Sequence, residues 1–251
     1  MGFGLEILLT KLEHIDHKLM ELQLQLNHLE EEITTSQCTY GKTSTSTPRK
    51  TPKSQQSPFT SCKDIPCTVS GVYLIRINNV SSPFAVYCEM DMFAGGWIVV
   101  QHGFDGSVDF YRNWKQYRQG FGDLDGEFWL GLEHIHQLTK NRKFELLVEM
   151  MDFAGNHGYA RYSDFQVGSE SEGYSLKILG SYSGTAGDGM EYSREKKFST
   201  KDRHNDGRTD LNFAVDRKSG WWHSFFGEHH QCMPTVKNVR DGQDPGILLL
   251  G

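Results

Sequence analysis

The sequence has no apolar run that approaches the ~20 residues needed to span a bilayer, so it predicts no membrane span. Clustered basic residues are also scarce. The 26 Lys and Arg are outnumbered by 32 Asp and Glu, and they are scattered apart from Lys196-Lys197 and Arg49-Lys50. Because binding to phosphates depends on clustered basic side chains, we expect no nucleic acid among the partners. The composition instead predicts a mildly acidic, solvated surface.

A secretory signal peptide is not visible at the N-terminus. Met1 leads into a heptad pattern without a basic region, a continuous apolar segment or a small-residue cleavage site. Yet Asn79-Val80-Ser81 is an acceptor for N-glycosylation, a modification of secreted proteins. We therefore interpret the start of this sequence as a truncated N-terminus.

Motifs for catalysis are also lacking. The stretch from Gly184 to Gly189 is rich in glycine, but no Gly-Lys-Ser/Thr follows it. His134 and His136 have no carboxylates at a zinc-binding spacing. No nucleophile or acid-base pair stands in a supporting context, so the sequence predicts a protein that is not an enzyme.

What the sequence does contain changes along its length. Residues 1–35 are rich in Leu and predict a helix, whereas residues 36–61 are mostly Thr, Ser, Lys, Gln and Pro. A segment with so few apolar groups cannot offset the entropy of ordering, so we expect a flexible linker there. All five Trp follow it, which predicts a globular domain over residues 62–226 and leaves residues 227–251 as a divergent tail.

The N-terminal segment has a strict alternation of three and four residues between apolar positions, which is typical of a coiled coil. We expect it to join copies of this chain or related chains. The alternative is a helix that docks on its own globular domain, where the spacing would drift toward 3.6. Leu at both kinds of seam position leaves the number of strands open. The predicted oligomerisation positions are Leu5, Leu8, Leu12, Ile15, Leu19, Leu22, Leu26, Leu29 and Ile33.

Glycines alternate with large aromatic residues after residue 94, an order that demands tight turns against aromatic faces. The blocks are Gly95-Gly96-Trp97, Asp105 to Phe110, Trp114, Gly120-Phe121-Gly122, Glu127 to Leu132, Gly184 to Asp188, Phe198-Ser199-Thr200 and Gly220-Trp221-Trp222. Together they closely resemble the signature of the fibrinogen C-terminal domain family, from about Cys62 to Trp222. The resemblance implies a secreted protein with an α+β domain of short strands and many loops.

Five cysteines cannot all pair within one chain. The resemblance implies a disulfide between Cys62 and Cys88, with Cys67 as a competitor for the place of Cys62. The stretches 71–75 and 84–87 predict two strands between them. Cys38 either joins neighbouring chains or is a free thiol, and Cys232 has no assigned partner.

The chain departs from the family pattern toward its C-terminus. Phe213 and Phe226 stand where the family has its second disulfide, so that bond is lost. After Trp222 we expect the family's ligand-pocket segment and its closing strand to be absent. The tail that replaces them, which ends in Ile247-Leu248-Leu249-Leu250-Gly251, resembles nothing that we can place.

The family's calcium loop corresponds to the run from Asp202 to Asp206. The resemblance implies Ca²⁺ ligands at Asp202, His204 and Asp206, although an imidazole is a poor ligand for a hard cation. The alternative is a solvated acidic turn.

Ficolins and tachylectins, which share this domain, bind acetylated sugars in a pocket beside that loop. The aromatic side chains that could stack on a sugar here belong to Trp221, Trp222, His223 and Phe225. Packing in the core is the favoured interpretation for these residues, because paired tryptophans are usually buried.

We expect a lectin-like protein of innate immunity that binds acetylated sugars on microbial surfaces through several heads at once. Joining heads through a coil raises avidity by about 10² to 10⁴ without a new contact. The alternative is a structural or dominant-negative partner that enters oligomers through its coil but carries a head that does not bind.

Overall fold

The structure is a computed structural model that describes residues 59–66, 68–151, 157–224 and 246–250, together with Lys18, Leu19 and Leu22. The chain divides into two compact units, Met1–Lys42 and Thr43–Gly251. In the first unit Leu19 and Leu22 are helical and exposed. The other predicted seam positions and the linker up to Pro58 lie outside the described residues, so the coiled coil stays a prediction. We call the described residues from Phe59 to Leu250 the head.

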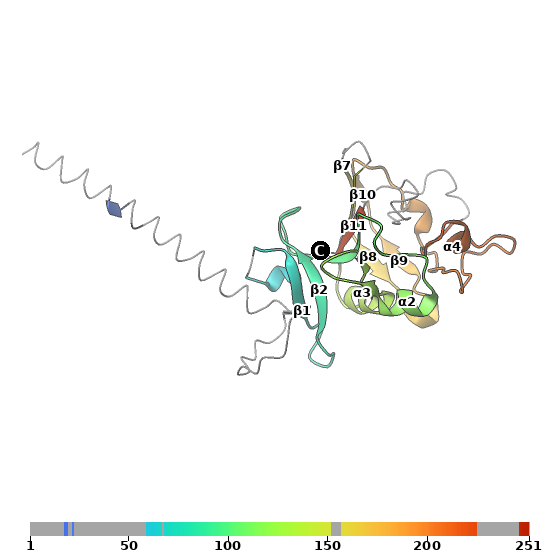
Figure 1. Cartoon of the computed structure of the whole chain (residues 1–251), viewed down its shortest axis with the longest axis horizontal. Coiled ribbons are helices and arrows are strands. Elements are labelled where there is room, and N and C mark those ends of the chain that lie inside the picture. Colours follow the sequence, from blue (N-terminus) through green and yellow to red (C-terminus); the bar gives the residue numbers. More distant parts are fainter. Residues whose placement is uncertain are drawn as a thin grey trace, which may run out of the picture. The chain divides into compact units, whose positions relative to one another are not determined.

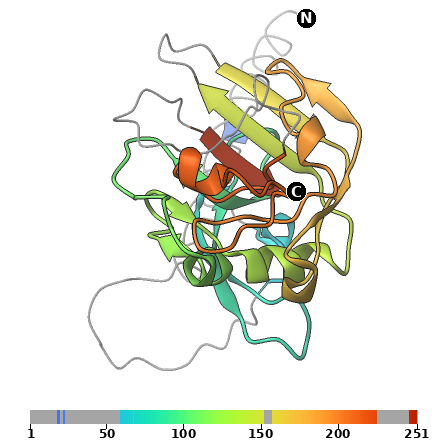
Figure 2. The same cartoon turned by 90° about the vertical axis from the view of Figure 1, so that its right-hand side faces the viewer.

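The head is built on one large, mostly antiparallel sheet, which contains nine strands among the described residues. Seven of them lie side by side in the order β1-β2-β3-β11-β6-β7-β10, and the short strands β4 and β5 join the sheet through β3 (Figures 1 and 2). A separate pair, β8 and β9, completes the strands. Their bounds are β1 Gly71–Ile75, β2 Phe84–Glu89, β3 Trp97–Gly103, β4 Phe121–Gly122, β5 Phe128–Trp129, β6 Leu146–Met151, β7 His157–Tyr162, β8 Phe165–Val167, β9 Leu176–Leu179, β10 Tyr182–Gly184 and β11 Gly246–Leu250.

The last strand, β11, corrects the prediction that the chain lacks a closing strand. It lies between β3 and β6 and is antiparallel to both, with Gly246 opposite Gly103 and Met150 and Leu250 opposite Ile98 and Leu146. Figure 2 shows it in red within the sheet. An uninterrupted apolar run such as Ile247–Leu250 is typical of a strand with neighbours on both sides, where polar alternation is not required. The resemblance to the family did not identify this strand, because β11 pairs with β3 and β6 through backbone groups.

Three short helices cover the sheet and its loops: α2 Trp114–Gln119, α3 Leu132–Thr139 and α4 Phe213–Asp216. Helix α2 begins with a capping box in which Asn113 and Gln116 satisfy each other's backbone N–H. Helix α3 buries one face through Leu132, Ile135 and Leu138. Short 3-10 helices at Cys62–Asp64, Glu170–Glu172 and Glu191–Ser193 tighten the connections. None of the helices in the described part of the chain is long and apolar enough to cross a membrane.

The aromatic core explains the sequence pattern of tryptophan and glycine. All five Trp are buried, and the ring of Phe198 lies among those of Trp114, Tyr117, Trp129 and Trp222. The glycines let the chain turn against these rings. A Cβ on Gly122, where φ is +89°, would lie 2.1 Å from the carbonyl oxygen of Glu127. Only glycine fits such a position.

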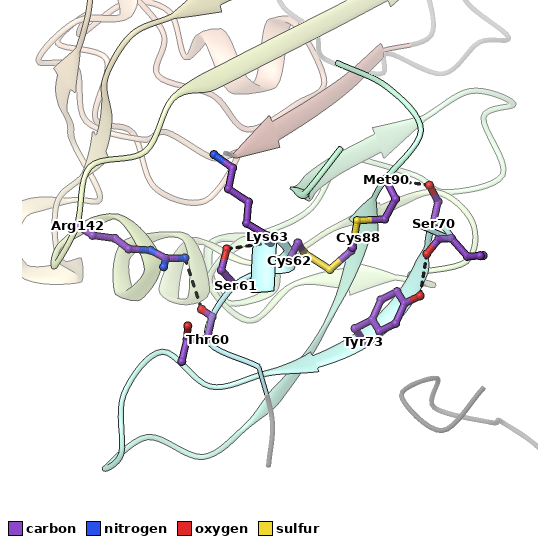
Figure 3. The surroundings of a disulfide bond; sticks show 10 residues. Thr60, Ser61, Cys62, Lys63, Ser70, Tyr73, Cys88, Met90 and Arg142 are labelled. Carbon is purple, nitrogen blue, oxygen red and sulfur yellow. Dashed lines mark hydrogen bonds between the residues drawn. A yellow bond between two sulfur atoms is a disulfide. The ribbon is translucent and has the colours of Figure 1, made fainter. Parts of the chain in front are cut away.

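At the other side of the head, Cys62 and Cys88 form the disulfide that the resemblance implied, with their Cα atoms 5.6 Å apart (Figure 3). The bond joins the Cys62–Asp64 helix to strand β2, whose partner β1 pairs Gly71 with Cys88. Nearby, the Ser70 hydroxyl accepts a hydrogen bond from the Met90 backbone N–H at 2.9 Å. Cys38, Cys67 and Cys232 lie outside the described residues.

Candidate functional site

The predicted calcium ligands lie in a loop near α4 that we define as the acidic loop, residues 202–210. The chain enters the loop through a tight turn. Two hydrogen bonds between the backbones of Thr200 and Arg203 close this turn. One residue earlier, Ser199 forms an isolated antiparallel bridge with Trp221. The loop and the tryptophan pair are therefore held together through backbone groups.

Asp202, the first predicted calcium ligand, faces helix α2. Its Oδ1 accepts hydrogen bonds from the Trp114 backbone N–H at 2.8 Å and from the Thr200 hydroxyl at 2.7 Å. The first N–H groups of a helix have no partner within the helix. Asp202 therefore supplies an acceptor to the start of α2.

Asp206, the second carboxylate, is fully buried and accepts from three donors. His204 Nε2 lies 2.5 Å from Oδ1, and the Arg208 backbone N–H donates to the same oxygen at 3.1 Å. The Phe213 backbone N–H donates to Oδ2 at 3.0 Å. Since a buried carboxylate is costly unless it is hydrogen-bonded, these donors make the burial of Asp206 possible.

Arg208 and Asp210 form a bidentate ion pair at the end of the loop. Arg208 Nε lies 2.9 Å from Asp210 Oδ1, and Nη2 lies 2.5 Å from Oδ2. The hydrogen bond from Arg208 lowers the pKa of the Asp210 carboxyl. The planar guanidinium matches a carboxylate in this geometry, which lysine cannot reproduce.

The three predicted calcium ligands are not arranged as a calcium site. Among the residues that the structure describes, no three or more His, Cys, Asp or Glu side chains are grouped so that they could hold a metal ion. Asp202 is bonded to α2, and the His204 ring occupies one oxygen of Asp206. Calcium takes six to eight oxygen ligands, so the residues present do not fit it.

Three of the aromatic residues that could stack on a sugar, Trp221, Trp222 and His223, lie in the core, as the favoured interpretation of the sequence had it. Trp221 and Trp222 are each 1% exposed, and their rings lie 5.2 Å apart in an edge-on contact. Trp222 Nε1 donates to the Tyr174 carbonyl at 2.7 Å, so its polar atom also points inward. His223 is buried as well, and burial lowers its pKa to about 4. Phe225 lies outside the described residues.

Phe213, which stands where the family has a cysteine, is buried at the start of α4. Its ring lies 6.0 Å from that of His223, and the guanidinium groups of Arg208 and Arg217 lie 5.9 and 5.4 Å from its centre. These contacts replace part of what a disulfide would supply. Phe226, its predicted partner, lies outside the described residues.

One polar centre was missed by the sequence reasoning. The Glu127 carboxylate is buried and accepts backbone N–H groups from Phe104, Asp105, Gly106 and Val108 at 2.6 to 2.9 Å. Burial alone would raise the pKa of Glu127, but the four N–H groups outweigh it and the pKa is lowered. The available signal was a glutamate directly before Phe128-Trp129, in a run of otherwise buried residues.

The predicted glycosylation acceptor, Asn79, lies in the exposed turn between β1 and β2. The Asn78 side chain shapes the turn by accepting from the backbone N–H groups of Val80 and Ser81 at 3.0 and 2.8 Å. Val80 is 96% exposed. The acceptor is therefore accessible.

Comparison with known proteins now identifies the head. The family described as fibrinogen beta and gamma chains, C-terminal globular domain, matches residues 61–239. The chain belongs to this family. The match extends beyond Trp222, where the resemblance was expected to stop. Members of this family bind other molecules rather than catalyse reactions, so this is a binding protein and not an enzyme.

The similar proteins include several angiopoietin-type chains. Human angiopoietin-related protein 1 is 43% identical over 172 residues, which cover 67% of this chain and 35% of the relative. Angiopoietin-1 of Bos taurus is 41% identical over 174 residues, covering 68% of this chain and 35% of the relative. The chain thus spans about a third of the length of these relatives.

Two solved structures show the same fold. The fibrinogen-like globe domain of human ANGPTL2 has a TM-score of 0.68 and 34% identity, covering 77% of this chain and 99% of that chain. Lamprey fibrin D-dimer, complexed with the peptide Gly-His-Arg-Pro-amide, has a TM-score of 0.65 and 26% identity, covering 96% and 88%. The α+β fibrinogen-like fold is thereby confirmed.

Proposed function

We propose that this chain is an extracellular binding protein whose fibrinogen-like head recognises a protein partner. The observation that carries the proposal is the lamprey fibrin structure, in which the same fold is complexed with a peptide. The angiopoietin-type relatives favour the same interpretation over the microbial lectin that the sequence suggested. Recognition of acetylated sugars loses its support on this chain, because Trp221, Trp222 and His223 are buried.

Two features of the head favour an extracellular location. The Cys62–Cys88 disulfide is buried between strand β2 and the 3-10 helix that opens the head. Disulfides persist in secreted proteins and are rare in the cytosol. The exposed acceptor at Asn79 fits the same compartment.

We place the binding surface at the end of the head that carries α4 and the acidic loop, because the sugar-binding relatives use a pocket beside this loop. Val215 on α4 offers an apolar side chain there that is 45% exposed. The β1–β2 turn lies at the opposite end of the head (Figure 1). Comparable substitutions at the two ends therefore separate a local effect from a general one.

The test uses the biotinylated full chain on two surfaces, an array of extracellular receptor domains and an N-acetylglucosamine resin. We expect saturable binding to at least one receptor domain that free N-acetylglucosamine does not reverse. Val215→Arg should weaken it at least about tenfold, because a charge in an apolar contact costs more than 1.4 kcal/mol. Val80→Arg, which keeps the glycosylation acceptor, is the matched control and should bind like the wild type.

Each other outcome contradicts a definite part of the proposal. Retention on the resin with release by N-acetylglucosamine would restore the lectin interpretation. Binding to neither surface would favour the alternative of a head that does not bind. Equal losses in Val215→Arg and Val80→Arg would remove the α4 end as the binding surface.

A further inference from the structure

We infer that the acidic loop is held together by its own side-chain and backbone donors, so that the head folds without calcium. The inference concerns residues 202–210 and does not depend on the proposed function. Its starting point is that each of the three carboxylates in the loop has a protein donor. Asp202 is bonded to Trp114, Asp206 to His204 and Asp210 to Arg208.

The histidine takes the place of the metal at the buried carboxylate. A cation in this loop would neutralise Asp206 and tie it to its neighbours, and the His204 Nε2 contact with Oδ1 supplies that link from within the chain. The remaining oxygen of Asp206 is used by the Phe213 backbone N–H, which leads the loop into α4. An imidazole nitrogen also suits a hard cation poorly, so His204 blocks the site rather than completing it.

Arg208 links the buried carboxylate to the exposed one. Its backbone N–H donates to Asp206, while its guanidinium holds Asp210 at two points. The same guanidinium lies near the ring of Phe213. One residue therefore connects both carboxylates to α4, and the positive charge that a calcium ion would bring is already present.

The first experiment measures thermal unfolding of the full chain with excess EDTA, with magnesium and with about 10 mM calcium. That concentration exceeds the ~10⁻³ M dissociation constants of the weakest extracellular calcium sites. We expect the three melting temperatures to agree within about 1 °C. A rise of several degrees that only calcium produces would overturn the inference.

A gain-of-function variant tests the cause. The double variant His204→Asp with Arg208→Gln removes the imidazole that contacts Asp206 and the guanidinium that holds Asp210, and adds a carboxylate. Calcium should then raise its melting temperature by about 3 to 6 °C at ten times the dissociation constant. The matched control is His204→Asp with Arg217→Gln, which removes the other guanidinium near Phe213 and keeps the Arg208–Asp210 pair. Calcium should raise the melting temperature of this control by less.

No response to calcium in the folded double variant would contradict the claim that His204 and Arg208 exclude the metal. If the double variant does not fold, the wild-type comparison with EDTA decides alone. Partner binding is a separate measurement. Absence of partner binding both with and without EDTA, at an unchanged melting temperature, would count against the proposed function and leave the metal-free loop intact.

Discussion

The two ends of the head are held by different chemistry. At the β1–β2 end a disulfide joins Cys62 to Cys88. At the α4 end, where the resemblance implied the loss of a second disulfide at Phe213, ring contacts and hydrogen-bonded carboxylates connect the acidic loop, α4 and the tryptophan pair. The comparison teaches that one fold can keep its outline when a covalent link is exchanged for many weaker contacts, provided that they share a well-packed aromatic core.

The largest expected effect lies at the α4 end, in the aromatic core. Trp222→Ala should lower the free energy of unfolding by about 3–5 kcal/mol, because it empties a large buried volume and removes the hydrogen bond to Tyr174. Urea denaturation followed by circular dichroism measures the change. Trp222→Phe is the control and should lose less, since it keeps an aromatic ring. A loss below about 1 kcal/mol for the alanine variant would show that this end depends little on its core.

The second largest effect on stability is expected at the β1–β2 end, which carries the disulfide. Replacing both Cys62 and Cys88 by Ala should lower the free energy of unfolding by about 3–4 kcal/mol, since the bond closes a loop with a sequence separation of 26 residues. The same urea denaturation measures it. Peptide mapping of the unreduced wild type should show the Cys62 and Cys88 fragments linked. Linkage of Cys67 to Cys88 instead would show that the partner was misassigned.

Glu127 lies at neither end and tests whether one carboxylate can hold a loop as a disulfide does. Glu127→Gln should cost about 1.5–3 kcal/mol at neutral pH, because the hydrogen bonds to the 104–108 backbone lose their charge. The folded pKa of Glu127 is lowered. Its contribution is therefore fully present above the unfolded value near 4.3 and is lost as pH falls through the folded value.

This direction of the pH dependence is checked by measuring the free energies of unfolding of the wild type and of Glu127→Gln from pH 7 to pH 3. The two curves should converge on acidification below about pH 4. A constant gap across this range would mean that the charge of Glu127 contributes nothing, and that only the shape of its side chain matters.

How far the sequence predicted the head depended on the kind of signal. Motifs of glycine and aromatic residues were predicted well, because a glycine at positive φ opposite a buried aromatic residue leaves few alternatives, as at Gly122 opposite Phe128. Strands β1 and β2 were predicted from their own residues, and the Cys62–Cys88 pair followed from the resemblance to the family. Strand β11 was missed because its partners, β3 and β6, are distant in sequence and pair through backbone groups that carry no residue signature.

The candidate site was harder to predict, because its chemistry depends on where side chains point. The resemblance implied that Asp202 and Asp206 share a calcium ion, whereas Asp202 accepts hydrogen bonds at the start of α2. The exposure of Trp221 and Trp222 likewise could not be determined from composition. The ion pair of Arg208 with Asp210 was not predicted, since a pair two residues apart carries no periodic signal.

The smallest expected effect on stability concerns the turn between β1 and β2. Asn79 is exposed beside Val80, so a glycan attached there would extend into solvent and touch no buried side chain. Asn79→Gln should therefore change the free energy of unfolding by less than about 0.5 kcal/mol. It should nevertheless remove the mass lost on glycosidase treatment from protein secreted by eukaryotic cells. Intact mass spectrometry measures this difference.

Ser81→Thr is the matched control for this prediction, because it preserves the acceptor and should remain glycosylated. Secreted wild-type protein whose mass does not change on glycosidase treatment would contradict the prediction. A glycan at this turn sharpens the contrast between the two ends. It would shield the β1–β2 end from partners and leave the α4 end, with Val215 exposed, as the surface open to recognition.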